Sequence, residues 1–231
     1  MEHLVALPQY DILAYLIVGL AFIAACDLTC GTRIILRADW GVSQTIVLAI
    51  AAYIAGHVLA IISTSLLETV LPPPVQYLIC KDCPRSKFFY TDRLETTTIN
   101  KIREKSKENN GGKILNDTEL FWDAYDTAKQ DEHAFERIIT FHQLFNFSRN
   151  GAFAFFIAGL VALVEGCRRR HGPRDETPAQ SELAEGLPQW LNNSNAQAAI
   201  FFAVSALMFF RYLYFFRAHS IEVLTSFAFA H

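Results

Sequence analysis

The sequence predicts an all-α fold: a four-helix transmembrane bundle with a soluble helical hairpin inserted between the second and third helices. Four long runs without Asp, Glu, Lys or Arg lead to this prediction. Their lengths are 15, 28, 15 and 25 residues, and they lie between Asp11 and Asp27, Asp39 and Glu68, Arg149 and Glu165, and Glu185 and Arg211. A bilayer core of about 30 Å needs about 20 helical residues. The second and fourth runs meet this length, and the first and third meet it when flanking polar residues lie at the interface.

The composition supports a membrane protein and argues against a nucleic-acid partner. Hydrophobic residues make up 52% of the 231 residues, and 19 of them are Phe. A net charge of −3 gives no basic footprint for nucleic acid. No Lys or Arg precedes Tyr10 and no small-residue cleavage pattern follows, so we expect the first apolar run to stay in the protein as a helix.

The breaks between the apolar runs place the helices. We expect transmembrane helices at residues 10–26, 43–70, 150–165 and 196–216. Pro72, Pro73 and Pro74 end the second one, because consecutive prolines cannot continue a helix. The chain then divides into three parts: two transmembrane helices (1–71), a soluble segment (72–149), and two transmembrane helices with a short tail (150–231).

The soluble segment, residues 72–149, carries 12 basic and 12 acidic residues and reads as a helical hairpin. Asn109-Asn110-Gly111-Gly112 is a turn signal between a charged helix at 91–107 and a second helix capped by Asn116 or Asp117. No breaker separates Thr118 from Gly151, so we expect the second helix to continue into the third transmembrane helix. This segment is the predicted surface for a protein partner.

The basic residues favour a cytoplasmic position for the hairpin and both chain ends in a cell (plasma or inner) membrane. Six Lys or Arg residues lie near the membrane on each side. The positive-inside rule gives less weight to basic residues in long loops such as the hairpin segment, and by that rule alone the hairpin would lie outside the cell. Against this, Arg149, Arg211 and Arg217 border two helices on the hairpin side, and the hairpin is rich in charge. Trp40 and Trp190 both fall on the other side, as interface anchors do.

One polar stripe runs along the second predicted helix. Tyr53, His57, Thr64 and Glu68 are spaced 4, 7 and 4 residues apart and therefore share a helix face. His57 lies near the middle of its apolar run, where an ionisable residue is costly and often belongs to a proton relay or an ion path. The alternative is a neutral imidazole that hydrogen-bonds to a neighbouring helix as packing.

Small residues predict close helix packing beside this stripe. The second helix carries Gly56, Ala60 and Ser63, and the third carries Ala154, Ala158 and Ala162 at four-residue spacing. Small side chains let helix backbones approach closely in lipid. We expect these two helices to pack together, within one chain or between copies of a homo-oligomer.

Charged residues at the membrane edge form a third group: Asp11, Arg149, Arg211 and Arg217. Arg211 lies inside the last turns of the fourth helix and needs a partner or a route to the interface. We expect Glu68 to pair with Arg211 or with Arg149. Such a pair either fixes helix register or acts as a gate.

Cys80 and Cys83 form a C-x-x-C unit, which can bind metal, cycle its redox state or remain as ordinary thiols. A zinc site needs a second ligand pair, and His133 and His142 supply one only if the hairpin folds back. We therefore expect no metal and no cofactor.

The sequence contains none of the phosphate-binding loops, nucleophile elbows or metalloprotease motifs of known enzymes. The predicted function is a non-enzymatic membrane sensor or scaffold that couples the hairpin to the bundle and forms a homo-oligomer. The alternative is an oligomeric ion or proton channel, pore-forming effector or small transporter that uses the stripe on the second helix. A membrane enzyme or redox protein using Cys80 and Cys83, or His57 with Glu68, is the third reading.

Overall fold

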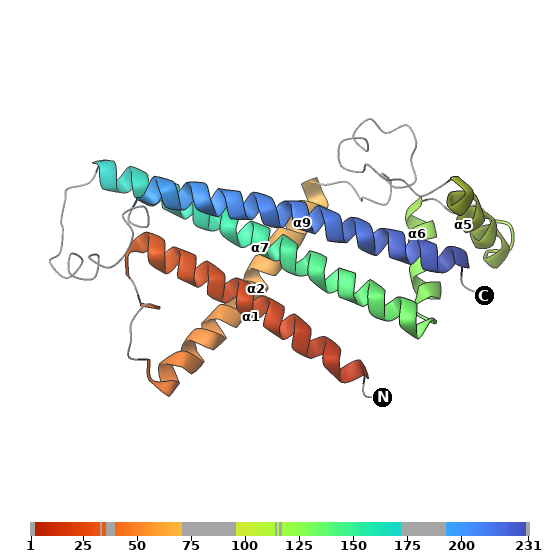
Figure 1. Cartoon of the computed structure of the whole chain (residues 1–231), viewed down its shortest axis with the longest axis horizontal. Helices are drawn as coiled ribbons and strands as arrows, with labels where there is room; N and C mark the ends of the chain where they lie inside the picture. Colours follow the sequence, from red (N-terminus) through yellow and green to blue (C-terminus); the bar gives the residue numbers. More distant parts are fainter. Residues whose placement is uncertain are drawn as a thin grey trace. The chain divides into compact units, whose positions relative to one another are not determined.

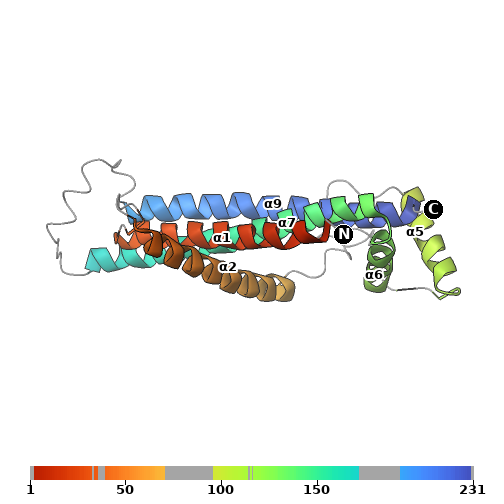
Figure 2. The ribbon, with the colours of Figure 1, turned by 90° about the horizontal axis from the view of Figure 1, so that it is seen from below.

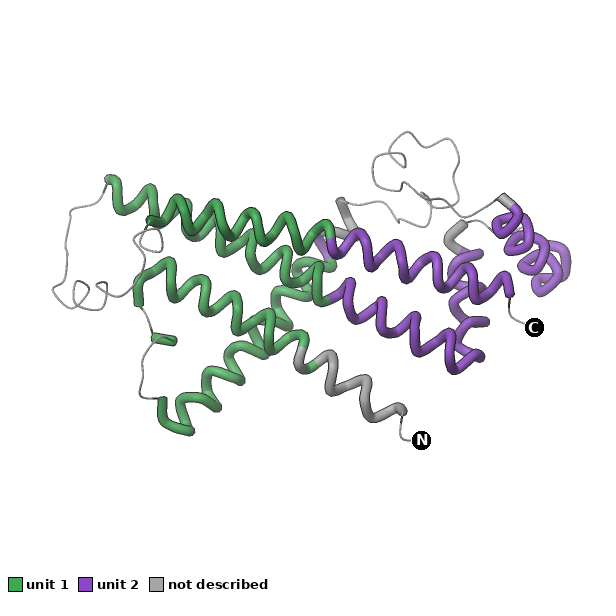
Figure 3. Tube along the Cα trace, in the orientation of Figure 1, with its two compact units in different colours: residues 1–64, 147–210 green, residues 65–146, 211–231 purple. Residues whose placement is uncertain are grey.

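The computed structural model describes residues 3–32, 34–35, 40–70, 96–113, 115, 117–171 and 193–229 (Figure 1). All regular structure within these residues is helical: α1 (His3–Cys30), α2 (Val42–Val70), α5 (Thr96–Asn109), α6 (Asp117–Ala128), α7 (Glu132–His171) and α9 (Ser194–Phe229). The all-α prediction is confirmed for this part of the chain. The chain forms two compact units, unit 1 with residues 1–64 and 147–210 and unit 2 with residues 65–146 and 211–231 (Figure 3). The helices α7 and α9 contribute residues to both units.

A close crossing of α1 and α2 organises unit 1 (Figure 1, Figure 2). A Cβ atom at Gly19 would overlap the backbone of Ala52, and one at Gly56 would overlap the backbone of Tyr15. The two helices can cross at this distance only because both positions are glycine. In lipid such backbone contact replaces the hydrophobic effect as the source of attraction between helices.

Two small apolar clusters fill the interior of unit 1. Val18, Leu59 and Ala154 join α1, α2 and α7. Ala25, Ala158, Ala162, Ala198 and Phe201 join α1, α7 and α9. Alanine predominates because it adds little volume between helices in close contact.

Most of the apolar surface of the long helices faces outward. The described residues include three helices long and apolar enough to span a membrane, at Val42–Leu66, Glu132–Arg170 and Ser194–Phe229. Only 22% of the apolar window of α2 and 17% of that of α9 is buried. The apolar stretch of α1, Ala14–Cys30, is shorter than these three.

Unit 2 has a larger hydrophobic core. It combines α5 and α6 with the parts of α7 and α9 at 132–146 and 211–229. Its buried members are Ile102, Leu120, Phe121, Ala124, Ala128, Ile138, Val223, Leu224 and Phe227. The left-handed Gly111 (φ 62°) and Gly112 (φ 91°) follow α5, and the Asp123 carboxylate accepts hydrogen bonds from Ser106 Oγ at 3.2 Å and Asn110 Nδ2 at 3.1 Å. These bonds join α5 to α6.

The structure differs from the uninterrupted helix that we predicted between Thr118 and Gly151. One helix ends at Ala128 and the next, α7, begins at Glu132. Asp131 caps α7, because its Oδ1 accepts hydrogen bonds from the backbone N–H groups of His133 at 3.0 Å and Ala134 at 3.2 Å. From Glu132 a new helix continues through the third apolar run to His171, whereas the helix that begins at Asp117 does not reach it.

The crossing of α1 and α2 makes a prediction for Gly56→Ala. The added methyl group would meet the backbone of Tyr15, which cannot yield as a flexible side chain does. We expect the free energy of unfolding to fall by about 1–3 kcal/mol, measured by SDS titration in mixed micelles with circular dichroism. Gly41→Ala is the control, since a Cβ there has no atom within 4 Å. Equal stability of the two variants would contradict the close crossing.

Candidate functional site

The structure brings part of the polar stripe on α2 together with a residue of α1. The rings of Tyr53 and His57 lie 5.2 Å apart, and Tyr15 packs edge to face on His57 at 4.4 Å. The Thr64 hydroxyl donates to the Ala60 carbonyl of its own helix at 2.8 Å. The side chain of Glu68 lies outside the described residues. The stripe is therefore observed as a cluster of three rings, Tyr15, Tyr53 and His57, beside the glycine crossing.

His57 is exposed on the outer face of α2 among apolar side chains. Its neighbours on this face include Ile54, Val58 and Ile61, which is 63% exposed. An imidazole at such a depth has no water to solvate it if α2 spans a bilayer. The position therefore suits a contact with a polar group outside unit 1.

The small residues that we predicted to pack α2 against α7 contact several different helices. Gly56 faces α1, whereas Ser63 is fully buried and its hydroxyl lies 2.8 Å from Asn150 Oδ1 of α7. On α7, Ala154 packs with Val18 and Leu59. Ala60 is also buried. The remaining predicted pair, Ala158 and Ala162, packs with α1 and α9.

A line of polar contacts joins three helices inside unit 1. Asn150 Oδ1 accepts from the Ser63 hydroxyl and, at 3.3 Å, from Arg149 Nε. Nearby in sequence, the Ala152 carbonyl accepts a hydrogen bond from Ser205 Oγ of α9 at 2.8 Å. The Ser63 hydroxyl also lies 3.0 Å from the Ala60 carbonyl of its own helix, so the contacts with Asn150 and Ala152 serve to connect α2 and α9 to α7.

The predicted charges at the membrane edge belong to different units. Arg149 lies in unit 1, and Arg211 and Arg217 lie in unit 2. The Arg211 guanidinium lies 5.5 Å from the centroid of the Phe215 ring, at a distance suited to a cation–π contact. The side chain of Asp11 lies outside the described residues, as does that of Glu68, so the ion pairs expected for Glu68 stay predictions.

The cysteines Cys80 and Cys83 lie outside the described residues. The described cysteines Cys26, Cys30 and Cys167 form no disulfide with one another. Among the residues that the structure describes, no three His, Cys, Asp or Glu side chains are grouped so that they could hold a metal ion.

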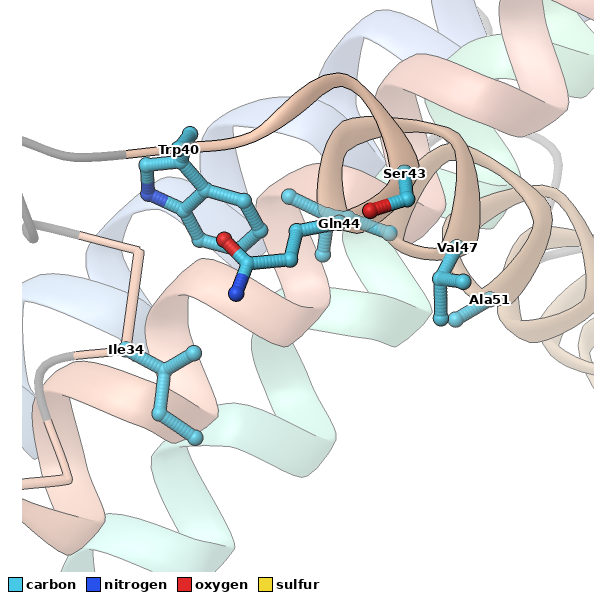
Figure 4. Close-up of a pocket in the computed structure, with 7 residues that line it drawn as sticks. Ile34, Trp40, Ser43, Gln44, Val47 and Ala51 are labelled. Carbon is cyan, nitrogen blue, oxygen red and sulfur yellow. The ribbon is translucent and has the colours of Figure 1, made fainter.

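A surface pocket of about 460 Å³ lies at the start of α2 (Figure 4). Its lining residues are Ile34, Trp40, Ser43, Gln44, Val47, Leu48 and Ala51. The buried carboxylate of Asp27 accepts hydrogen bonds from the backbone N–H groups of Ile34 at 2.9 Å and Ile35 at 3.0 Å. The described residues that line this pocket are mostly apolar.

Sequence reasoning missed a buried histidine in unit 2. His219 of α9 is 6% exposed, and its ring contacts include His142 at 5.6 Å and Phe145 at 5.5 Å between ring centroids. Neither ring nitrogen has a hydrogen-bond partner among the described residues. The two histidines are far apart in sequence, and only the packing of α9 on α7 brings them together.

The chain matches no protein-family model, and the comparisons with curated proteins and with solved structures gave no match. Function is therefore inferred from the arrangement of the residues themselves, because a fold class alone does not define an activity.

The contact between Ser63 and Asn150 makes a second prediction. A double-mutant cycle with Ser63→Ala and Asn150→Ala should give a coupling energy of about 0.5–1.5 kcal/mol, measured as free energy of unfolding in mixed micelles. Thr64→Ala is the control, because the Thr64 hydroxyl bonds within its own helix. Additive effects of the two substitutions would show that the bond contributes nothing between α2 and α7.

Proposed function

We propose that this chain is a multi-pass, non-enzymatic membrane subunit that senses or scaffolds through unit 2. Unit 1 forms a four-helix bundle in the bilayer, and unit 2 is the water-facing helical module, built around the α5–α6 hairpin, that binds a protein partner. The observation that carries the proposal is that α7 and α9 each contribute to both units. A change at the module would thereby reach the membrane helices through these two helices.

Exposed apolar side chains support the placement of unit 1 in lipid. Val47, Ile61, Val164 and Leu207 are each more than 60% exposed and lie on three different helices. Burying one such side chain away from water is worth about 1.5–3 kcal/mol, and a bilayer supplies that burial without a protein partner. The fourth span is α1, whose Val18 and Ala25 pack into the two clusters of unit 1.

The polarity of α5 supports the placement of unit 2 in water. Lys101, Arg103, Glu104, Lys107 and Glu108 are exposed on this helix, and charged side chains are costly in hydrocarbon. At 40 and 36 residues, α7 and α9 are longer than the roughly 20 residues that cross a bilayer. Their ends in unit 2 therefore extend beyond the membrane. We place this unit and both chain ends on the cytoplasmic side of the cell membrane.

An exposed tryptophan identifies the surface of unit 2 that we assign to the partner. Trp122 of α6 is 56% exposed and lies edge to face with Phe121 and Tyr125 at 5.8 Å each. Tryptophan held by neighbouring rings is typical of the residues that dominate binding energy at protein interfaces. The acidic residues Glu119 and Asp126 flank it on the same helix.

The surface around Trp122 can be tested with a photo-crosslinking amino acid. p-Benzoylphenylalanine at position 122 should capture one defined cytosolic protein in intact cells, identified by mass spectrometry. The same group at position 107, on the exposed face of α5, is the matched control. Equal capture at both positions, or none at position 122, would contradict a partner surface around Trp122.

The alternative function, a proton or ion channel, pore-forming effector or small transporter, rests on His57. Several copies would bring the exposed imidazoles of their α2 helices around one path, because a single four-helix chain is too small for a wide pore. The same exposed imidazole supports a homo-oligomer under the leading proposal, with His57 hydrogen-bonded across the contact between copies.

The substitution His57→Leu tests both roles. A lost hydrogen bond between helices should weaken self-association by about 3- to 15-fold, which corresponds to about 0.6–1.7 kcal/mol. Subunit exchange between vesicles, followed by energy transfer, measures this change. Val58→Leu on the same exposed face is the control. Unchanged association would remove His57 from the contact between copies.

Proton flux into vesicles separates the two functions. A flux in the wild type that His57→Leu abolishes and Val58→Leu retains would favour the channel. The absence of flux in vesicles that hold the oligomer would favour the scaffold.

A further inference from the structure

His219 is a buried titratable group of unit 2, and neither of its ring nitrogens has a hydrogen bond to a described residue. Rings from two helices surround it: Phe121 and Tyr125 of α6, each at 6.2 Å, and His142 and Phe145 of α7. Ser220, the next residue on α9, is fully buried and donates only to the Phe216 carbonyl of the same helix. The imidazole is therefore held by packing alone.

Among the described residues, the charged and titratable groups around His219 do not offer a counter-ion. Tyr125 faces it from α6 and His142 from α7. On α9 the acid nearest in sequence, Glu222, is bound by Arg137 of α7 at 2.7 Å, and Arg217 adds a positive charge on the same helix. The lysines of α5, Lys101 and Lys105, lie over Phe229 and Phe227. A proton on His219 would thus add positive charge where the neighbours of the ring described above, Phe121, Tyr125, His142 and Phe145, include no carboxylate.

We propose that unit 2 is a pH-sensitive module in which protonation of His219 releases α6 from the parts of α7 and α9 in that unit. An imidazolium has two N–H donors and needs acceptors or water for both, and the described residues of the closed core give neither ring nitrogen a hydrogen-bond partner. Aromatic faces do attract a cation, by about 0.5–2 kcal/mol. Removing a cation from water costs several kcal/mol, so the aromatic contacts do not offset the loss. The proton is accommodated only when the core opens.

The direction of the effect follows from the two states of unit 2. In our placement His219 lies on the part of α9 beyond the bilayer, so its open state meets water. Burial, and after it the charge of His142, lowers the pKa of His219 to about 3 in the closed unit. In the open unit the imidazole has an ordinary pKa of about 6.5. The open form then binds the proton more tightly, so closure is complete above about pH 6.5 and weakens as the pH falls from there toward 3.

Hydrogen exchange of the full chain in lipid nanodiscs tests the proposal. Between pH 7.5 and pH 5.0 the opening equilibrium should rise about 30-fold, from the two pKa values and the linkage relation. The readout is the exchange rate at 119–128 and 219–229, corrected for the intrinsic effect of pH. A rise of less than 3-fold in the wild type would overturn the proposal.

Two variants test whether His219 causes the pH dependence of the opening equilibrium. His219→Phe keeps an aromatic ring without a titratable group and should remove the pH dependence. His133→Phe, at an exposed position of α7 in the same unit, should leave the dependence unchanged. A pH dependence that persists in His219→Phe would overturn the proposal.

A direct measurement covers the case in which His219→Phe fails to fold. Nitrogen NMR of histidine-labelled wild type reports the protonation state of each imidazole. The proposal expects neutral His219 in the closed unit at pH 5.0, and an imidazolium there would overturn it. This test is independent of the partner at Trp122, so the pH response and the proposed function can fail separately.

Discussion

Unit 1 depends on direct backbone contact where α1 crosses α2. Because Gly19 and Gly56 have no side chains, the two helices meet at a distance that no other residue allows. The crossing buries Ala52 completely and sets Tyr15 against His57. It also turns the opposite face of α2, with its isoleucines and valines, outward. His57 lies beside the crossing, where its ring packs on Tyr15 of α1 while its side chain stays exposed.

The helix α7 shows how one helix is adapted to two kinds of surroundings. In unit 1 its buried residues include Ala154, Ala158 and Ala162, whereas in unit 2 they are Ile138 and Phe145 with Ala134. In water large apolar side chains stabilise a core by the area that they bury. Under the proposed placement of unit 1 in lipid that gain is absent there, and small residues allow close packing and hydrogen bonds such as the one between Ser63 and Asn150.

Local signals in the sequence were sufficient for much of the helical layout. Charge-free runs located α2 and the apolar halves of α7 and α9, and the glycine pair located the turn after α5. The break before Glu132 has no Gly or Pro, and only the capping of α7 by Asp131 in the folded chain reveals it. The contact of Tyr15 with His57 and that of His142 with His219 join different helices. A helical period within one segment carries no information about such partners.

The order of residues along the chain has a consequence for synthesis. The core of unit 2 combines Ile102 and Phe121 with Val223, Leu224 and Phe227. The first two leave the ribosome long before the last three, and the apolar residues of α7 and α9 that belong to unit 1 emerge in between. Until α9 is synthesised, α5 and α6 have apolar faces without their partners. These apolar faces stay exposed during synthesis, which is the state in which a nascent chain is prone to aggregation.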